Sequence, residues 1–170
     1  MINEIRYEIP QKEVDYSLPS IFLAGPTVRG NQPHLVSWRF AAIEEFRKQN
    51  YSGNLIIPEF SNKQESDKGR KDIPLWEFEG LIKSDVIMFW IPRTKELIGL
   101  TTNHELGYWM GRDRDKIVYG RPNDAYRIDY LDIMWVEDCK DCKNRFPDED
   151  PALVYTTLEA TVRASIQKID

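Results

Sequence analysis

The sequence predicts an α/β fold in which helices cover both faces of a parallel sheet. Short apolar segments alternate along the chain with stretches that have helical spacing of apolar residues, which is the pattern of successive strand–helix–strand units. One apolar segment, residues 85–91 (DVIMFWI), has almost no polar position, as expected of a central strand covered on both faces. The 170 residues have the length of one domain, so we expect a single domain over residues 1–170.

The residues themselves indicate four strands and five helices. The predicted strands are residues 20–25, 54–60, 85–91 and 116–120. The predicted helices are residues 34–49, 72–83, 101–112, 125–136 and 151–169. Asp72 is the expected N-cap of the second helix, with Pro74 in its first turn. The polar residues 61–71 are typical of a surface loop.

Composition and charge exclude several classes of protein. Hydrophobic residues make up 41% and charged residues 30%, which excludes a disordered chain. The net charge is −5, whereas a general nucleic-acid binder needs a basic face, so we expect no nucleic-acid partner. No apolar run approaches the length of a membrane span, and Glu4, Arg6 and Glu8 stand where a signal peptide would be apolar. We therefore expect a cytoplasmic protein with no membrane partner.

Ligands of such a sheet bind beyond the carboxyl ends of its strands, so the loops that follow the strands come first. The first loop, GPTVRG, has Gly25 and Gly30, which allow close approach of the backbone to a ligand, and it leads into a helix N-terminus that favours anions. Arg29 in this loop favours a phosphate or carboxylate. Neither a Walker loop nor a GxGxxG motif is present, and an ordinary strand-to-helix turn is the alternative interpretation.

Two carboxylates are candidates for chemistry at this edge of the sheet. Glu105 follows Thr102 by three residues, so the pair fits a capping box, yet Glu105 also lies at the carboxyl edge, where it can act as a nucleophile or base. Glu77, in the helix before the third predicted strand, is placed to pair with Glu105. When two carboxylates share one cleft, their like charges push their pKa values apart. One group then stays protonated and can act as an acid, and the other ionises and can act as a nucleophile.

The two cysteines, Cys139 and Cys142, form a lone CxxC motif. Structural zinc needs four ligands, and the two histidines, His34 and His104, lie far upstream. We expect plain thiols, with no metal site and no disulfide framework.

Several segments resemble the nucleoside 2-deoxyribosyltransferase superfamily, in particular its nucleoside 2-deoxyribosyltransferase-like branch. The resemblance runs from about residue 20 to residue 125. The matching segments are SIFLAGP (20–26), Trp38-Arg39, Trp76-Glu77, SDVIMFWIP (84–92) and IGLTTNHELGYWM (98–110). The resemblance implies a flavodoxin- or Rossmann-like three-layer sandwich with a parallel sheet of about five strands. It also implies exchange of the base of a 2′-deoxynucleoside without metal or organic cofactor, in a homo-oligomer.

The resemblance assigns roles to individual residues. Glu105, in the Glu-Leu-Gly segment, matches the nucleophile that attacks C1′ of the sugar. Glu77 matches the acidic residue, usually Asp, that holds the base and moves its proton. Phe22 stands nearest to a Tyr that positions the nucleophile, and it lacks the hydroxyl. The expected substrate-binding residues are Phe22, Gly25, Pro26, Arg29, Trp38, Trp76 and Asn103.

Two alternatives to the transferase remain open. A nucleotide N-glycosidase is compatible with Arg29 and the same Glu105, since the Gly25–Gly30 loop suits a 5′-phosphate. A nucleotide-binding or sensing module without turnover is favoured by Phe22 and by the polar segment before Glu105. In each case the expected partner is a nucleoside or nucleotide.

Overall fold

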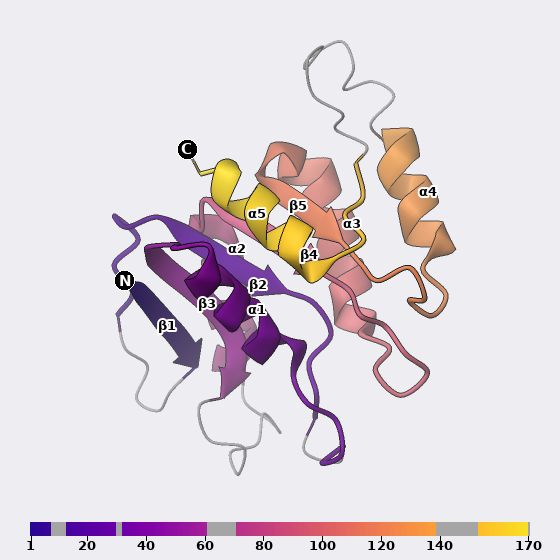
Figure 1. Ribbon diagram of the computed structural model, residues 1–170, viewed down its shortest axis with the longest axis horizontal. Helices are drawn as coiled ribbons and strands as arrows, with labels where there is room; N and C mark the ends of the chain where they lie inside the picture. The colour runs from indigo at the N-terminus through magenta and orange to yellow at the C-terminus, as the bar shows by residue number, and fades with distance from the viewer. Residues whose placement is uncertain (8–12, 30–31, 61–70, 139–152, 170) are drawn as a thin grey trace.

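Five parallel strands form one sheet in the computed structural model, which describes residues 1–7, 13–29, 32–60, 71–138 and 153–169. The order of the strands in this sheet is β1-β3-β2-β4-β5, and every neighbouring pair is parallel (Figure 1). The strands are β1 (Ile2–Tyr7), β2 (Ser20–Ala24), β3 (Gly53–Phe60), β4 (Val86–Trp90) and β5 (Ile117–Gly120).

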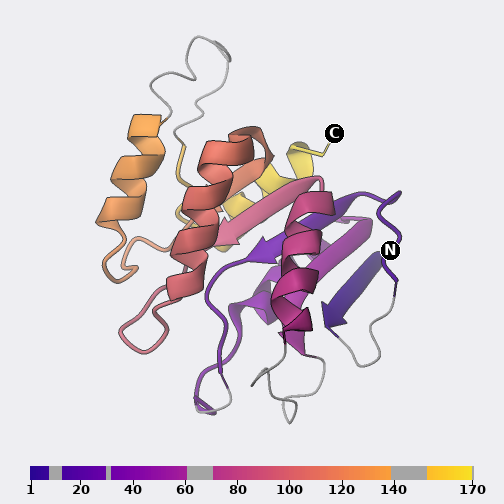
Figure 2. The same ribbon diagram turned by 180° about the vertical axis from the view of Figure 1, so that it is seen from behind.

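Helices cover both faces of the sheet. α1 and α5 lie on the face seen in Figure 1, and α2, α3 and α4 lie on the face seen in Figure 2. The helices are α1 (Trp38–Lys48), α2 (Asp72–Lys83), α3 (Leu100–Asp113), α4 (Asp129–Asp138) and α5 (Leu158–Gln167), and a short 3-10 helix, η1 (Arg114–Lys116), precedes β5. The predicted three-layer α/β sandwich with about five parallel strands is confirmed.

Two apolar clusters, one on each face, hold the layers together. Successive side chains of a strand point to opposite faces, so β4 supplies both clusters. Ile87 and Phe89 belong to the cluster under α2, α3 and α4, whereas Met88 and Trp90 belong to the cluster under α1 and α5. The prediction that residues 85–91 form a central strand covered on both faces is confirmed.

Four of the five helices start elsewhere than predicted, and α2, which has the predicted bounds, differs in its N-cap. α1 begins at Trp38, because the Ser37 hydroxyl accepts a hydrogen bond from the backbone N–H of Arg39 and caps it. α2 begins with Asp72 as its first residue, and Lys71 is the N-cap. α4 begins at Asp129. α5 begins at Leu158, where Thr157 caps the helix, and residues 151 and 152 of that prediction lie outside the described residues.

The predicted capping box at Thr102 and Glu105 is wrong. α3 begins at Leu100, its N-cap is Gly99, and no side chain caps its first turn. Glu105 is therefore in the second turn of the helix and takes no part in a cap. Two other expectations, a loop over residues 61–70 and thiols at Cys139 and Cys142, fall outside the described residues.

Candidate active site

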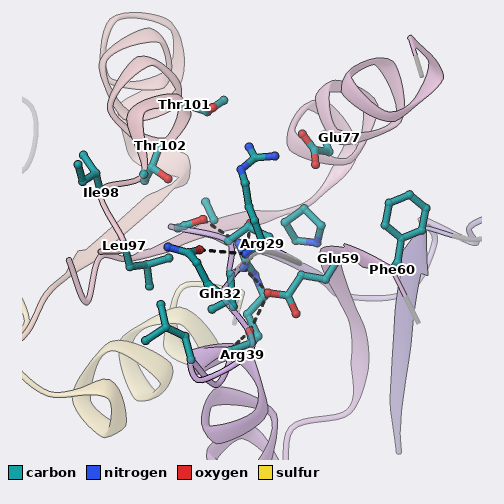
Figure 3. A pocket seen from close by; sticks show the side chains of 18 of the residues that line it. Arg29, Gln32, Arg39, Glu59, Phe60, Glu77, Leu97, Ile98, Thr101 and Thr102 are labelled. Atoms are coloured by element: carbon teal, nitrogen blue, oxygen red, sulfur yellow. Dashed lines mark hydrogen bonds and ion pairs between the residues drawn. The ribbon is translucent and has the colours of Figure 1, made fainter. Parts of the chain in front are cut away.

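A cavity of about 780 Å³ lies at the carboxyl ends of the strands, where the topology changes direction. β2 lies between β3 and β4, and the helices that lead to these two neighbours, α1 and α2, lie on opposite faces of the sheet. Such a switch point opens a crevice beyond the strand ends. The loop after β2, the end of β3, α2, the loop after β4 and the first turn of α3 form the walls (Figure 3).

A buried arginine fixes the loop after β2. The Arg39 guanidinium, 1% exposed, donates from Nε to the carbonyl of Leu23 (3.0 Å) and from Nη2 to that of Gly25 (2.9 Å). Its Nη1 donates to Glu59 Oε1 at 2.8 Å and contacts the Thr27 hydroxyl at 3.2 Å (Figure 3). Burial lowers the pKa of Arg39, and the adjacent carboxylate of Glu59 opposes that shift. Arg39 thus joins α1, the end of β2 and the end of β3.

The loop after β2 also depends on a glycine. Gly25 has a φ of +153°, and a Cβ added there would lie 2.2 Å from the backbone oxygen of Trp90. The residue that follows β2 therefore packs directly against the end of β4. The sequence suggested that Gly25 lets the backbone approach a ligand. In the structure Gly25 lets the backbone approach the neighbouring strand, and Gly25 also lines the cavity.

Two carboxylates from neighbouring helices face the cavity. Glu77 comes from α2 and Glu105 from α3, and both line the same space. Burial raises the pKa of Glu105 to about 7, the nearby carboxylate of Glu77 adds to the rise, and Arg39 opposes it. The two side chains thus interact electrostatically, as the sequence predicted from their positions. One proton shared between such groups gives one acid and one base or nucleophile.

The first turn of α3 lines the cavity from the opposite side to β3. Gly99, the N-cap, has a φ of 65°. A Cβ added to Gly99 would lie 2.8 Å from Cγ of Pro26, so the loop before α3 packs closely against the loop after β2. Thr101 and Thr102 follow at the cavity wall. With no side-chain cap, the helix dipole and the first N–H groups favour an anion at this end.

The comparison with known protein families agrees with this geometry. A family model described as "nucleoside 2-deoxyribosyltransferase like" matches residues 18–123. The chain belongs to this family. No curated protein matches the chain. The matched region contains both carboxylates and the loop after β2, whereas β1 (Ile2–Tyr7) lies outside it.

Five of the predicted site residues of this family member line the cavity, and four do not. Those that line it are Phe22, Gly25, Arg29, Glu77 and Glu105. Arg29 extends into the cavity and points toward Glu77 (Figure 3). The other predicted residues, Pro26, Trp38, Trp76 and Asn103, lie behind the wall.

Each of these four residues supports the site from outside. The Trp38 indole donates to the carbonyl of Pro26 at 3.0 Å, which helps to fix the loop after β2. Trp76 packs edge-to-face on Tyr7, with ring centroids 5.7 Å apart. The side-chain oxygen of Asn103 accepts a hydrogen bond from the buried Arg93. Asn103 is thereby tied to the loop after β4, two residues before Glu105.

The cavity residues that were not predicted from the sequence include four with polar side chains: Arg6, Tyr7, Arg39 and Glu59. Arg39 belongs to the Trp38-Arg39 pair that matches the family. Its charged side chain on the apolar face of a predicted helix was the feature that could have pointed to a role in the site. Glu59 follows a proline at the end of a predicted strand, which places it at the carboxyl edge. Arg6 and Tyr7 gave no signal, because β1 itself was not predicted.

The described part of the chain has neither a metal-ligand cluster nor a membrane-spanning helix. There, no group of three or more His, Cys, Asp or Glu side chains is arranged to hold a metal ion. Over the same residues, no helix has the length and apolar character needed to cross a bilayer.

Proposed function

We propose that this protein transfers the base of 2′-deoxynucleosides through a covalent glycosyl intermediate on Glu105. The observation that carries the proposal is the pairing of Glu105 with Glu77 in one cavity of a family member. In the first step a Glu105 carboxylate oxygen bonds to C1′ while the C1′–N bond breaks and its electron pair leaves with the base. Glu77 gives the departing base a proton.

The second step reverses the first. A second base attacks C1′, the ester bond to Glu105 breaks, and Glu77 takes back a proton from the incoming base. Two displacements on opposite faces give net retention, as in retaining glycosidases. Arg39 supports this chemistry because its positive charge favours the ionised form of Glu105, which is the form that attacks.

The test is product analysis of nucleoside incubated with and without a second free base. We expect exchange when the base is present, with kcat/KM falling as pH rises through about 7, because the Glu105–Glu77 pair then loses the one proton that the departing base needs. Glu105→Gln should lower turnover by at least about a thousandfold, since it removes the nucleophile. Mass spectrometry of acid-quenched enzyme should find a deoxyribosyl group on the peptide that contains Glu105.

Glu79→Gln is the matched control. Glu79 lies on the same helix as Glu77, two residues on, but it is exposed and pairs with Lys83 at 2.6 Å. This variant should turn over like the wild type. Normal turnover by Glu105→Gln would overturn the proposed mechanism.

A nucleotide N-glycosidase is the second candidate, and a specific observation favours it. Arg29 and the uncapped first turn of α3 line the same cavity, and together they suit a 5′-phosphate. Release of the base from a 5′-monophosphate, without exchange, would support this function. If the protein gave neither release nor exchange, the result would support a binding module without turnover. The argument for such a module is Phe22, which stands in place of a tyrosine.

A further inference from the structure

Arg6 brings to the cavity a cation whose hydrogen-bonding capacity is unused. Its side chain is 13% exposed, and it lies 3.6 Å from a Glu4 oxygen and 3.7 Å from Glu59 Oε2. Both are ion-pair distances longer than a hydrogen bond, and among the described residues the guanidinium makes no hydrogen bond. Five N–H donors in a largely buried fork without an acceptor are costly, unless a ligand supplies one.

Two nearby arginines differ from Arg6 in this respect, because both make hydrogen bonds. Arg39 also faces the cavity, but its nitrogens donate to backbone carbonyls, to Thr27 and to Glu59. Arg47 pairs with the same Glu4 as Arg6, yet it hydrogen-bonds Glu4 and Glu44 and lies on the outer surface of α1, away from the cavity wall.

Glu59 faces Arg6 with Oε2 at ion-pair distance, while its other oxygen is engaged elsewhere. Its Oε1 accepts from the Ser37 hydroxyl at 2.7 Å and from Arg39 at 2.8 Å. The position of Arg6 is fixed by its strand and by Phe40, whose ring centroid lies 5.6 Å from the guanidinium carbon. A rigid, partly desolvated donor therefore faces the cavity.

The place of Arg6 in the fold indicates which part of a substrate reaches it. β4 and α3 lie on one side of β2, and β3 and β1 lie on the other. The α3 end, with its uncapped first turn, suits the anionic or hydroxyl end of the sugar. The β1–β3 end has the aromatic rings of Tyr7, Phe40 and Phe60, which suit a planar base.

We propose that Arg6 selects the base, by donating to the exocyclic oxygen of a 6-oxopurine. This inference rests on the proposed function, and it names the substrate class of the same site. A carbonyl oxygen at position 6 supplies the acceptor that Arg6 lacks, and N7 remains for the proton from Glu77. A 6-aminopurine places N–H groups there, so the guanidinium gains no hydrogen bond from the base and the base is rejected. β1, which carries Arg6, lies outside the region that the family model matches, so this inference rests on the geometry of Arg6 alone.

The test compares 2′-deoxyinosine with 2′-deoxyadenosine, which differ only at position 6 and the adjacent N1 proton. kcat/KM is measured for both nucleosides, and for their 5′-monophosphates, with the wild type and the variants Arg6→Met, Arg6→Lys and Arg47→Met. Binding of the same four compounds is measured by calorimetry on Glu105→Gln. The double variants of Glu105→Gln with Arg6→Met and with Arg6→Lys are measured in the same way.

The wild type should prefer the 6-oxo compound by about ten- to a hundredfold, as expected for a charge-assisted hydrogen bond. Arg6→Met should lose most of this ratio, and Arg47→Met should keep it. Arg6→Lys retains the charge beside Glu4 and Glu59 but lacks the planar fork, so it should keep part of the ratio. Thermal unfolding shows whether each variant is folded. If Arg6→Met does not fold, Arg6→Lys is used to test the preference for the 6-oxo compound.

The outcomes separate this inference from the proposed function. Turnover with equal preference for both compounds, or an unchanged ratio in folded Arg6→Met and Arg6→Lys, overturns the role of Arg6 and leaves the function standing. Selective binding that depends on Arg6, without turnover of any compound, overturns the function and supports Arg6. Failure to bind any of the four compounds overturns both.

Discussion

Glu105 occupies a position where the protein opposes the charge that its proposed chemistry requires. Burial and the carboxylate of Glu77 raise its pKa from 4.5 to about 7, and Arg39 offsets only part of the rise. A desolvated carboxylate is a better nucleophile than a hydrated one, because no water must be removed when it attacks C1′. The cost of this arrangement appears in the stability of the folded protein.

The pH dependence of that cost can be predicted. The folded state holds the Glu105 proton up to about pH 7, whereas the unfolded chain releases it near its ordinary pKa of 4.5. Between these values the folded state binds more protons, so the free energy of unfolding falls as pH rises, by about 3 kcal/mol at most. Glu105→Gln removes this loss.

We therefore expect Glu105→Gln to raise the thermal midpoint at pH 8 and to leave it nearly unchanged at pH 5. Thermal unfolding at both pH values measures the difference, and Glu79→Gln, which alters an exposed carboxylate, is the control. The same shift at both pH values would mean that Glu105 is not held protonated by its surroundings.

Arg29 is the residue whose substitution tests whether the substrate carries a phosphate. It lines the cavity, which also includes the uncapped first turn of α3. If nucleotides are the substrates, Arg29→Ala should raise KM for a 5′-monophosphate at least about tenfold, through loss of charge-assisted hydrogen bonds, and should spare the nucleoside. Steady-state kinetics on a matched nucleoside and nucleotide measure this. Equal losses with both substrates would indicate that Arg29 only supports the loop.

At the scale of elements, the site depends on how closely the ends of β2 and β4 approach. Gly25→Ala would place a Cβ 2.2 Å from a backbone oxygen of Trp90 and 2.7 Å from the Trp38 ring, at a positive φ. We expect a loss of about 2–4 kcal/mol in the free energy of unfolding, from backbone strain and overpacking together. Chemical denaturation measures the loss.

Gly111→Ala is the matched control for this prediction. Gly111 lies in α3, where an added Cβ meets no atom within 4 Å. Alanine there should stabilise the helix by about 0.5–1 kcal/mol. If Gly25→Ala were equally well tolerated, the loop after β2 would have more freedom than its contacts with β4 indicate.

The sequence predicted elements whose residues carry a pattern of their own, and it failed where the environment decides. β4 was predictable because five apolar residues in a row are stable only when covered on both faces. β1, with Asn3, Glu4 and Arg6, has the composition of an edge strand, and only its pairing with β3 makes it a strand. Its contribution to the cavity was therefore invisible in the sequence.

The start of α3 shows the same limit on a smaller scale. Thr102 and Glu105 have the spacing of a capping box, but the helix begins earlier, at Leu100, since Gly99 takes the left-handed conformation that the contact with Pro26 requires. Local spacing cannot reveal a contact between two loops 73 residues apart. The pairing of Glu77 with Glu105 was predictable, because strand order alone brings α2 and α3 to the same edge.

At the scale of the whole molecule, an exposed apolar stripe runs along α2, which also lines the cavity. Leu75, Phe78 and Ile82 are spaced three and four residues apart on α2, so they form one stripe, and they are 69%, 41% and 41% exposed. The Phe78 ring contacts Tyr108 of α3, with centroids 6.0 Å apart, which extends the stripe onto the next helix. An exposed stripe of this kind commonly marks a protein–protein interface.

We expect a homo-oligomer whose subunits meet through this stripe, next to the cavity that α2 also lines with Glu77. Leu75→Glu should weaken the association by introducing a charge into an apolar contact, and activity should fall with it if the neighbouring subunit helps to close the site. Light scattering over a range of micromolar concentrations measures the mass. Ile133→Glu, at an exposed position of α4 (59%, against 69% for Leu75), is the control and should leave the mass unchanged. Dissociation by Ile133→Glu instead would move the interface to α4, whereas a fully active monomer in the wild type would mean that the stripe faces water.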